Sequence, residues 1–342
     1  MLSRSLPAKA LLLPILAASL AIGCVVAVLY GMFPYSAGYN EVRKSVIDFA
    51  SQMWKLEDWQ HCFLVPLGSA FIIYLDRKKL ATLPVAGAWS GLPVVLLALC
   101  IFWFGYQADI VYFGYISMQA AIAGMIILFF GWHWMKALAF PWLFLCFMWP
   151  LLFLDNIVAF PLRIIMSHAS VAALNLIGIP SVLSGTGILS APDAMTGRPI
   201  GAQFSVDVAD PCSGIRSLFA LMMVSALYGH FAVTGWWKKW ILFLASIPLA
   251  VMGNLFRILI LTFGTIAFGP EVAIGTLKDP SFFHMLAGYV VYAVAIGGML
   301  AVSWLLNAKW ATLADRLRRF ASQPPPPPKT SASTTPPAGD VY

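Results

Sequence analysis

The sequence predicts an all-α integral membrane protein with about eight transmembrane helices and a small extracytoplasmic loop or β-hairpin cap. Of its 342 residues, 61% are hydrophobic and only 10% are charged, whereas soluble domains carry about 25% charged residues. The apolar residues fall in runs long enough to cross a bilayer, which takes about 20 helical residues. Lipid is therefore the solvent expected for most of the chain.

Each predicted span is an apolar run with few charges. The runs lie at 10–33, 62–75, 83–105, 110–131, 137–154, 213–233, 240–268 and 285–306. A further apolar stretch at 157–179 is interrupted by Arg163, His168 and Asn175. We interpret this stretch as an interfacial helix that does not cross the membrane.

The basic residues orient the spans. With the N-terminus inside, 13 of the 21 Lys and Arg residues fall in cytoplasmic segments, as the positive-inside rule requires. Of the 14 acidic residues, 11 fall on the opposite side. Both termini are therefore predicted to be cytoplasmic. Because the charge of +7 is spread over loops between spans, it argues against nucleic acid as a partner.

The spans and loops divide the chain into six segments. They are an N-terminal basic segment with the first transmembrane helix (1–34), an external loop with an interfacial helix (35–61), transmembrane helices 2 to 5 (62–154), an interfacial helix with an external cap (155–211), the last three transmembrane helices (212–308) and a disordered, proline-rich cytoplasmic tail (309–342). Trp54 and Trp59 are expected to anchor the first external loop at the lipid interface. Glycines and prolines within 180–211 predict a small hairpin.

Cys212 is the cysteine best placed for chemistry. It follows Pro211 where the external cap becomes a helix running inward. The free N–H groups and the dipole of a first helical turn favour a thiolate. Arg216 lies one turn further on and would add positive charge beside the sulfur. In the alternative interpretation, Cys212 is a small buried residue, like the four cysteines in apolar runs, and Arg216 reaches the interface.

Arg257 and His284 complete the set of candidate residues. Arg257 lies well inside an apolar run, where an unpaired arginine is costly, so it either faces a polar cavity or is held by structural hydrogen bonds. His284 lies at the outer mouth of the last span, where a histidine is alternatively a helix cap.

The predicted topology brings Cys212, Arg257 and His284 to one leaflet. A thiolate, a histidine and a guanidinium are sufficient for acyl transfer. Around Cys212 and His284 no second histidine or carboxylate lies at metal-ligand spacing, so neither a metal nor another cofactor is expected.

These motifs resemble the exosortase and archaeosortase family, which are sorting transpeptidases of the PEP-CTERM type. The resemblance is carried by Cys-Ser-Gly-Ile-Arg at 212–216, Asn-x-x-Arg at 254–257, His284, His-Cys-Phe-Leu-Val-Pro at 61–66, Phe-Pro-Trp at 140–142 and Leu-Ile-Gly-Ile-Pro at 176–180. It implies that Cys212 is the nucleophile, with Arg257 and His284 as its catalytic partners. Ser213, Arg216 and Asn254 would be supporting or substrate-binding residues. Cys62 and Pro211 depart from the usual family pattern and leave the subtype open.

The resemblance also implies the reaction. It is cleavage of C-terminal sorting signals of secreted proteins, through a thioester, at the outer face of a bacterial inner membrane. The substrates would end in a short Pro-Glu-Pro type motif, a hydrophobic helix and a basic tail. The cleaved protein would pass to an unknown envelope acceptor, with membrane lipid as the other partner and extracellular polysaccharide as the associated process. A multi-pass transporter and a transferase acting on lipid or sugar carriers remain alternative functions.

Overall fold

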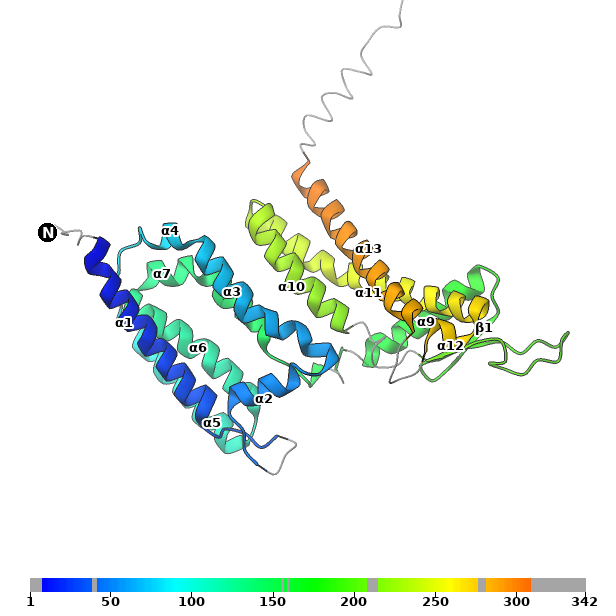
Figure 1. The fold of residues 1–342 in the computed structure, drawn as a ribbon, viewed down its shortest axis with the longest axis horizontal. Helices are drawn as coiled ribbons and strands as arrows, with labels where there is room; N and C mark the ends of the chain where they lie inside the picture. The colour runs from blue at the N-terminus through cyan, green and yellow to red at the C-terminus, as the bar shows by residue number, and fades with distance from the viewer. Residues whose placement is uncertain are drawn as a thin grey trace, which may run out of the picture.

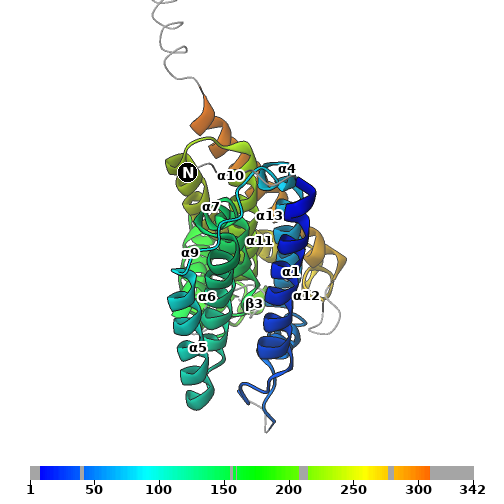
Figure 2. The ribbon, with the colours of Figure 1, turned by 90° about the vertical axis from the view of Figure 1, so that its left-hand side faces the viewer.

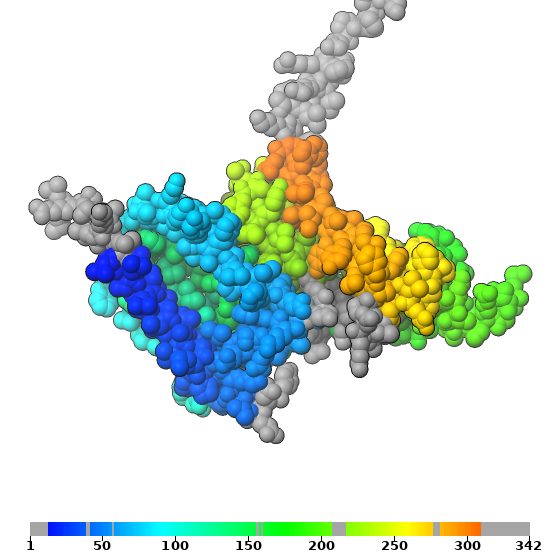
Figure 3. Space-filling view, in the orientation of Figure 1, coloured from blue at the N-terminus to red at the C-terminus, as the bar shows by residue number. Residues whose placement is uncertain are grey.

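The computed structural model describes residues 8–38, 42–154, 157–158, 160–207, 215–275 and 281–308 (Figure 1). Within these ranges the chain is mostly helical and contains one small sheet. The helices pack in two groups, at the left and the right of Figure 1. Helix α10 (Ile215–Ala232) connects them, because it contacts elements of both groups, and Figure 3 shows it between α3 and α13.

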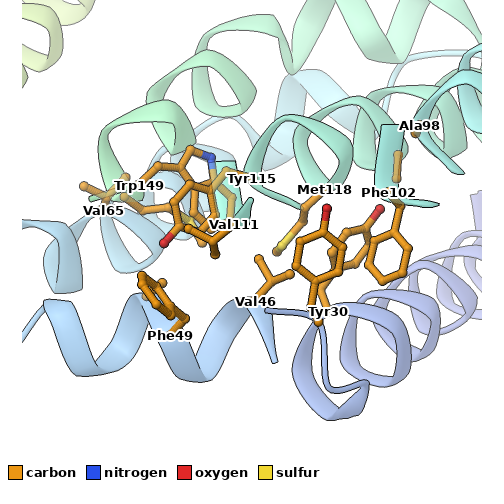
Figure 4. Close-up of a cluster of buried hydrophobic side chains, with 14 of the residues drawn as sticks. Tyr30, Val46, Phe49, Val65, Ala98, Phe102, Val111, Tyr115, Met118 and Trp149 are labelled. Atoms are coloured by element: carbon orange, nitrogen blue, oxygen red, sulfur yellow. The ribbon is translucent and has the colours of Figure 1, made fainter. Parts of the chain in front are cut away.

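The first group is built on three helices that run side by side (Figure 2). They are α1 (Ala8–Val26) with its extension η1 (Ala27–Met32), α5 (Gly91–Ala108) and α6 (Val111–Phe130). Helices α5 and α6 pack closely because Gly91 lacks a side chain, and an added Cβ would lie 2.8 Å from Leu128 Cα. Aromatic residues fill the adjoining core (Figure 4), where the Tyr30 hydroxyl and Ser117 Oγ are hydrogen-bonded at 2.7 Å.

The segment after η1 folds against this group. It contains α2 (Val46–Met53), η2 (Glu57–Phe63), α3 (Leu64–Leu75) and α4 (Arg77–Leu80). Trp59 is only 2% exposed, and its ring lies 5.4 Å from that of Phe219 on α10. The prediction that Trp59 anchors the chain in lipid is therefore wrong, because its side chain packs inside the protein.

Two predicted spans are shortened or broken in the structure. Residues 83–90 are not helical, and in this segment the Ala88 amide donates to the Ile127 carbonyl. The run at 137–154 is broken into α8 (Ala139–Phe144) and η3 (Leu145–Met148), which follow the short helix α7 (Trp132–Ala137). Trp149 is extended because the following residue is Pro150, which disfavours the helical conformation before it.

A helix and a small sheet follow. Helix α9 (Phe160–Leu176) has 17 residues and lies within the stretch predicted to be interfacial. Strands β1 (Ser181–Ser184), β2 (Gly187–Ser190) and β3 (Ser205–Asp207) form an antiparallel sheet in the order β1-β2-β3. The β1–β2 turn uses Gly185 at a φ of 62°, which glycine adopts without strain. The predicted hairpin is therefore present, and a third strand extends it.

The second group contains α10, α11 (Trp236–Phe268), α12 (Pro270–Ala273) and α13 (Phe282–Asn307). Helix α11 is longer than the predicted run at 240–268. Helix α13 packs against α11 and runs in the opposite direction.

Five helices in the described part of the chain are long and apolar enough to cross a membrane. They are Leu13–Met32, Gly91–Ala108, Val111–Phe130, Trp236–Phe268 and Phe282–Asn307. The apolar helices Ala139–Met148 and Ser217–Ala232 are shorter, and α3 has 12 residues. The structure thus supports a multi-span membrane protein, while the count of eight spans stays a prediction.

Candidate active site

A hydrogen bond joins two of the predicted site residues. Arg257 on α11 and His284 on α13 are 27 residues apart in sequence, and the distance from Arg257 Nη2 to His284 Nε2 is 2.8 Å. A guanidinium has only donors, so His284 Nε2 must accept this bond. The neutral imidazole therefore carries its proton on Nδ1, which is buried and has no hydrogen-bond partner among the described residues.

Arg257 lies in the second half of α11, within a largely apolar part of that helix. It is partly buried, and its neighbours along α11 include Asn254, which is 3% exposed, and Ile258, which is 1% exposed. A cation at such a position is costly unless it is paired or solvated. The bond to His284 supplies one acceptor for the guanidinium and places both side chains at the seam between α11 and α13.

His284 is held by the cap of its own helix. Ser281 is the N-cap of α13, and its Oγ accepts a hydrogen bond of 3.0 Å from the His284 amide. The same hydroxyl donates a bond of 3.0 Å to the Ala273 carbonyl at the end of α12. Ser281 thereby joins the start of α13 to the segment that follows α11, which limits the positions available to His284.

The small sheet packs beside this pair. Ile188 from β2 belongs to a buried cluster with Ile258 and Leu261 from α11 and Ala287 from α13. Ile258 is adjacent to Arg257 in sequence, and Ala287 lies one helical turn after His284. Apolar packing by the sheet therefore covers one side of the helix pair.

The nucleophile predicted from sequence falls outside the described residues. Cys212 and Ser213 lie between the end of β3 at Asp207 and the start of α10 at Ile215. Arg216 is in the first turn of α10, and its side chain is also outside the description. Of the six predicted site residues, the structure brings together Arg257 and His284, with Asn254 on the same helix as Arg257.

The direction of α10 places its first turn toward the end of the helix bundle that contains Arg257 and His284. Leu218 and Leu221 of α10 pack with Ala250 of α11 and Ala295 of α13. From Ala250, α11 continues for two turns to reach Arg257, and α10 runs antiparallel to α11. Ile215, the first residue of α10, therefore lies on the same side of the Ala250 level as Arg257.

His61 makes a contact that sequence reasoning missed. Its ring is stacked on Phe219 of α10, with the centroids 6.2 Å apart and the planes at 10°, and Trp59 packs beside it. Phe219 lies one turn after Ile215, so His61 supports the beginning of α10. A histidine opening an apolar run in 61–66 was the available signal, but nothing in the sequence indicated Phe219 as its neighbour.

Among the residues that the structure describes, no three His, Cys, Asp or Glu side chains are grouped so that they could hold a metal ion.

Comparison with known protein families finds a match. The family model described as transmembrane exosortase matches residues 53–301, which include η2, the sheet and most of α13. No curated protein and no solved structure matches the chain.

Proposed function

The chain belongs to the transmembrane exosortase family, and on that premise we propose that it cleaves and transfers secreted proteins through a thioester on Cys212. Members of this family are cysteine-type transpeptidases that act on secreted protein substrates. The observation that carries the proposal is the hydrogen bond between Arg257 and His284, because it joins a guanidinium and an imidazole at one point of the helix seam.

Chain length keeps Cys212 close to the start of α10. It is three residues before Ile215, so its Cα lies within about 11 Å of the start of α10. The first turns of α10 pack against α11 and α13. These two relationships support an active site formed by the segment before α10, by α11 and by the first turn of α13.

The hydrogen bond between Arg257 and His284 has to break before the first proton transfer. While Arg257 occupies Nε2, His284 has no free lone pair with which to accept a proton. In our proposal the substrate carbonyl attracts the guanidinium away from His284. The freed Nε2 then accepts the thiol proton of Cys212, and the thiolate attacks the carbonyl carbon.

The later steps use the same three groups. Arg257 stabilises the tetrahedral oxyanion. As the C–N bond breaks, the imidazolium of His284 gives its proton to the departing amine, which leaves a thioester on Cys212. His284 then accepts the proton of the incoming nucleophile, and attack on the thioester releases the thiol. Arg216 adds positive charge for the thiolate or for the acidic residue of the motif, while Ser213 and Asn254 hold the peptide.

The proposed substrates are secreted proteins with a short Pro-Glu-Pro type motif, a hydrophobic helix and a basic tail. The motif would meet Cys212 at the outer face of a bacterial inner membrane and be transferred to an envelope acceptor. The ends of α4, α7 and α13, which the topology assigns to the cytoplasm, lie toward the top of Figure 1. Helix α12, which it assigns to the outer side, lies lower. This arrangement supports the predicted alternation of inner and outer segments.

The experiment is processing of a co-expressed secreted reporter that carries such a C-terminal signal. An immunoblot would compare the unmodified chain with Cys212→Ala, and with Cys62→Ala as the matched control at a buried thiol. We expect shortening of the reporter by the unmodified chain and by Cys62→Ala but not by Cys212→Ala. Equal shortening by Cys212→Ala would refute the assignment of the nucleophile.

A further inference from the structure

The helix seam that holds Arg257 and His284 is shaped by glycines. On α11, Gly253, Arg257 and Gly264 are separated by four and seven residues, a spacing that places them on one face. An added Cβ at Gly253 would lie 3.0 Å from Val291 Cγ1 of α13. The same face of α11 therefore carries the catalytic arginine and two points of close helix approach.

Gly264 makes the closer of these approaches. An added Cβ would lie 2.8 Å from Phe283 Cζ and closer still to Cε1. The ring of Phe283 occupies the space that any larger residue at position 264 would fill. Phe283 directly precedes His284 in sequence, so the position of its ring is coupled to the first turn of α13.

Phe283 is partly buried, and its neighbours limit the directions in which its ring can move. It packs in the cluster that contains Ile258, Leu261 and Ala287, and its centroid is 6.1 Å from that of Phe268. Restoring ordinary contact at about 3.4 Å would require a relative shift of roughly half an ångström or more. His284 Nε2 is bonded to Arg257 at 2.8 Å, and hydrogen bonds weaken steeply once distance and angle depart from their optimum.

We infer that Gly264 is a positioning residue for the catalytic pair. Its missing side chain admits the Phe283 ring, which fixes the height and rotation of the first turn of α13 against α11 and brings His284 to Arg257. This inference rests on the proposed function only in giving the Arg257–His284 pair its catalytic role. We call this height and rotation of α13 against α11 the register, and it is a property of the helix seam that does not depend on catalysis.

The register can be measured without catalysis. Arg257→Cys and His284→Cys are introduced into a chain whose native cysteines are replaced, and the pair is bridged with a short bis-methanethiosulfonate in membranes. Adding Gly264→Ala should reduce the bridging yield severalfold, and adding Phe283→Leu to it should restore the yield. Gly297→Ala is the control, because nothing lies within 4 Å of an added Cβ at that position. An unchanged yield with Gly264→Ala would overturn the inference.

Reporter processing supplies the catalytic readout in a chain with native Cys212, Arg257 and His284. We expect Gly264→Ala to lower kcat at least about tenfold, since small misplacements of catalytic groups cost up to about a hundredfold. KM should change little, and Gly264→Ala with Phe283→Leu should recover most of the loss. A double variant no faster than Gly264→Ala would overturn the inference. If bridging responds as expected but the unmodified chain cleaves no reporter, the proposed function fails and the register inference stands.

Discussion

Arg257 donates its hydrogen bond to the same nitrogen of His284 that a proton-accepting histidine would need. The bond is 2.8 Å long and joins Nη2 to Nε2 across the α11–α13 seam. The arginine therefore has two tasks in our proposal, holding the imidazole at rest and the oxyanion during reaction. A planar guanidinium can serve two acceptors with fixed geometry, whereas an ammonium is a point charge.

Arg257→Lys tests these tasks while keeping the charge. We expect the initial rate of reporter processing to fall by about 10²- to 10³-fold, the loss typical of removing one oxyanion donor. Arg43→Lys is the control, since Arg43 donates to the Tyr35 and Tyr106 carbonyls in the first helix group. A rate for Arg257→Lys close to that of Arg43→Lys would show that the guanidinium geometry is dispensable.

Ser281 gives a prediction about the start of α13. Its hydroxyl accepts from the His284 amide and donates to Ala273, so Ser281→Ala removes an N-cap worth about 1 kcal/mol. We expect faster hydrogen exchange at the His284 amide and slower reporter processing. Ser281→Thr retains the hydroxyl and should behave like the unmodified chain. If this variant processes the reporter slowly although exchange at the His284 amide is normal, the N-cap does not control the activity.

The order of helices was largely predictable, since long apolar runs of the kind found at 110–131 and 285–306 have few other structures available. The bounds were less predictable where local packing decides them, as in residues 83–90, where a backbone hydrogen bond to Ile127 replaces a helical turn. The role of Trp59 was missed because hydropathy does not distinguish a lipid-facing aromatic side chain from one packed on Phe219.

Arg257 and His284 could be named from the sequence, but the contact between them could not. Chemistry and motif order pointed to Arg257 and His284 separately. Their direct bond depends on the rotation of α11 against α13, which is set by close contacts such as the one between Gly264 and Phe283. Because the two partners are 27 positions apart in sequence and lie on different helices, no periodic pattern indicates this rotation.

The predicted topology can be tested by labelling cysteines with a membrane-impermeant maleimide in cells with a permeabilised outer membrane. Asp193→Cys, in the loop after β2, should be labelled because we place that loop outside. Lys238→Cys, at the start of α11, should be labelled only after the membrane is disrupted. Labelling of Lys238→Cys in intact inner membranes would contradict the orientation and the side on which the site opens.

Asp193 gives a prediction with a defined pH direction. The pKa of its carboxyl is lowered by hydrogen bonds from the Thr196 hydroxyl and the Met195 amide. Because the folded pKa lies below the unfolded value of about 3.9, this stabilisation is present above that value and is lost as the pH falls through the folded pKa.

The Met195 amide should accordingly be protected from hydrogen exchange at neutral pH. Relative to intrinsic rates, protection should decrease at a pH below the folded pKa, and Asp193→Ala should remove it at all pH values. Thr186, in the β1–β2 turn, offers a control position for Thr186→Ala, which leaves the Asp193 contacts in place. Protection that is independent of pH would show that the carboxylate does not hold this turn.

The central claim is that Cys212 forms a thioester with the cleaved substrate, and trapping that adduct tests it most directly. The purified chain is incubated with the reporter without an acceptor, quenched in acid and examined by peptide mass spectrometry, with and without hydroxylamine. We predict a reporter adduct on the Cys212 peptide that hydroxylamine removes and that Cys212→Ala lacks. Processing of the reporter with the adduct on another residue, or an adduct that persists in Cys212→Ala, would contradict the account.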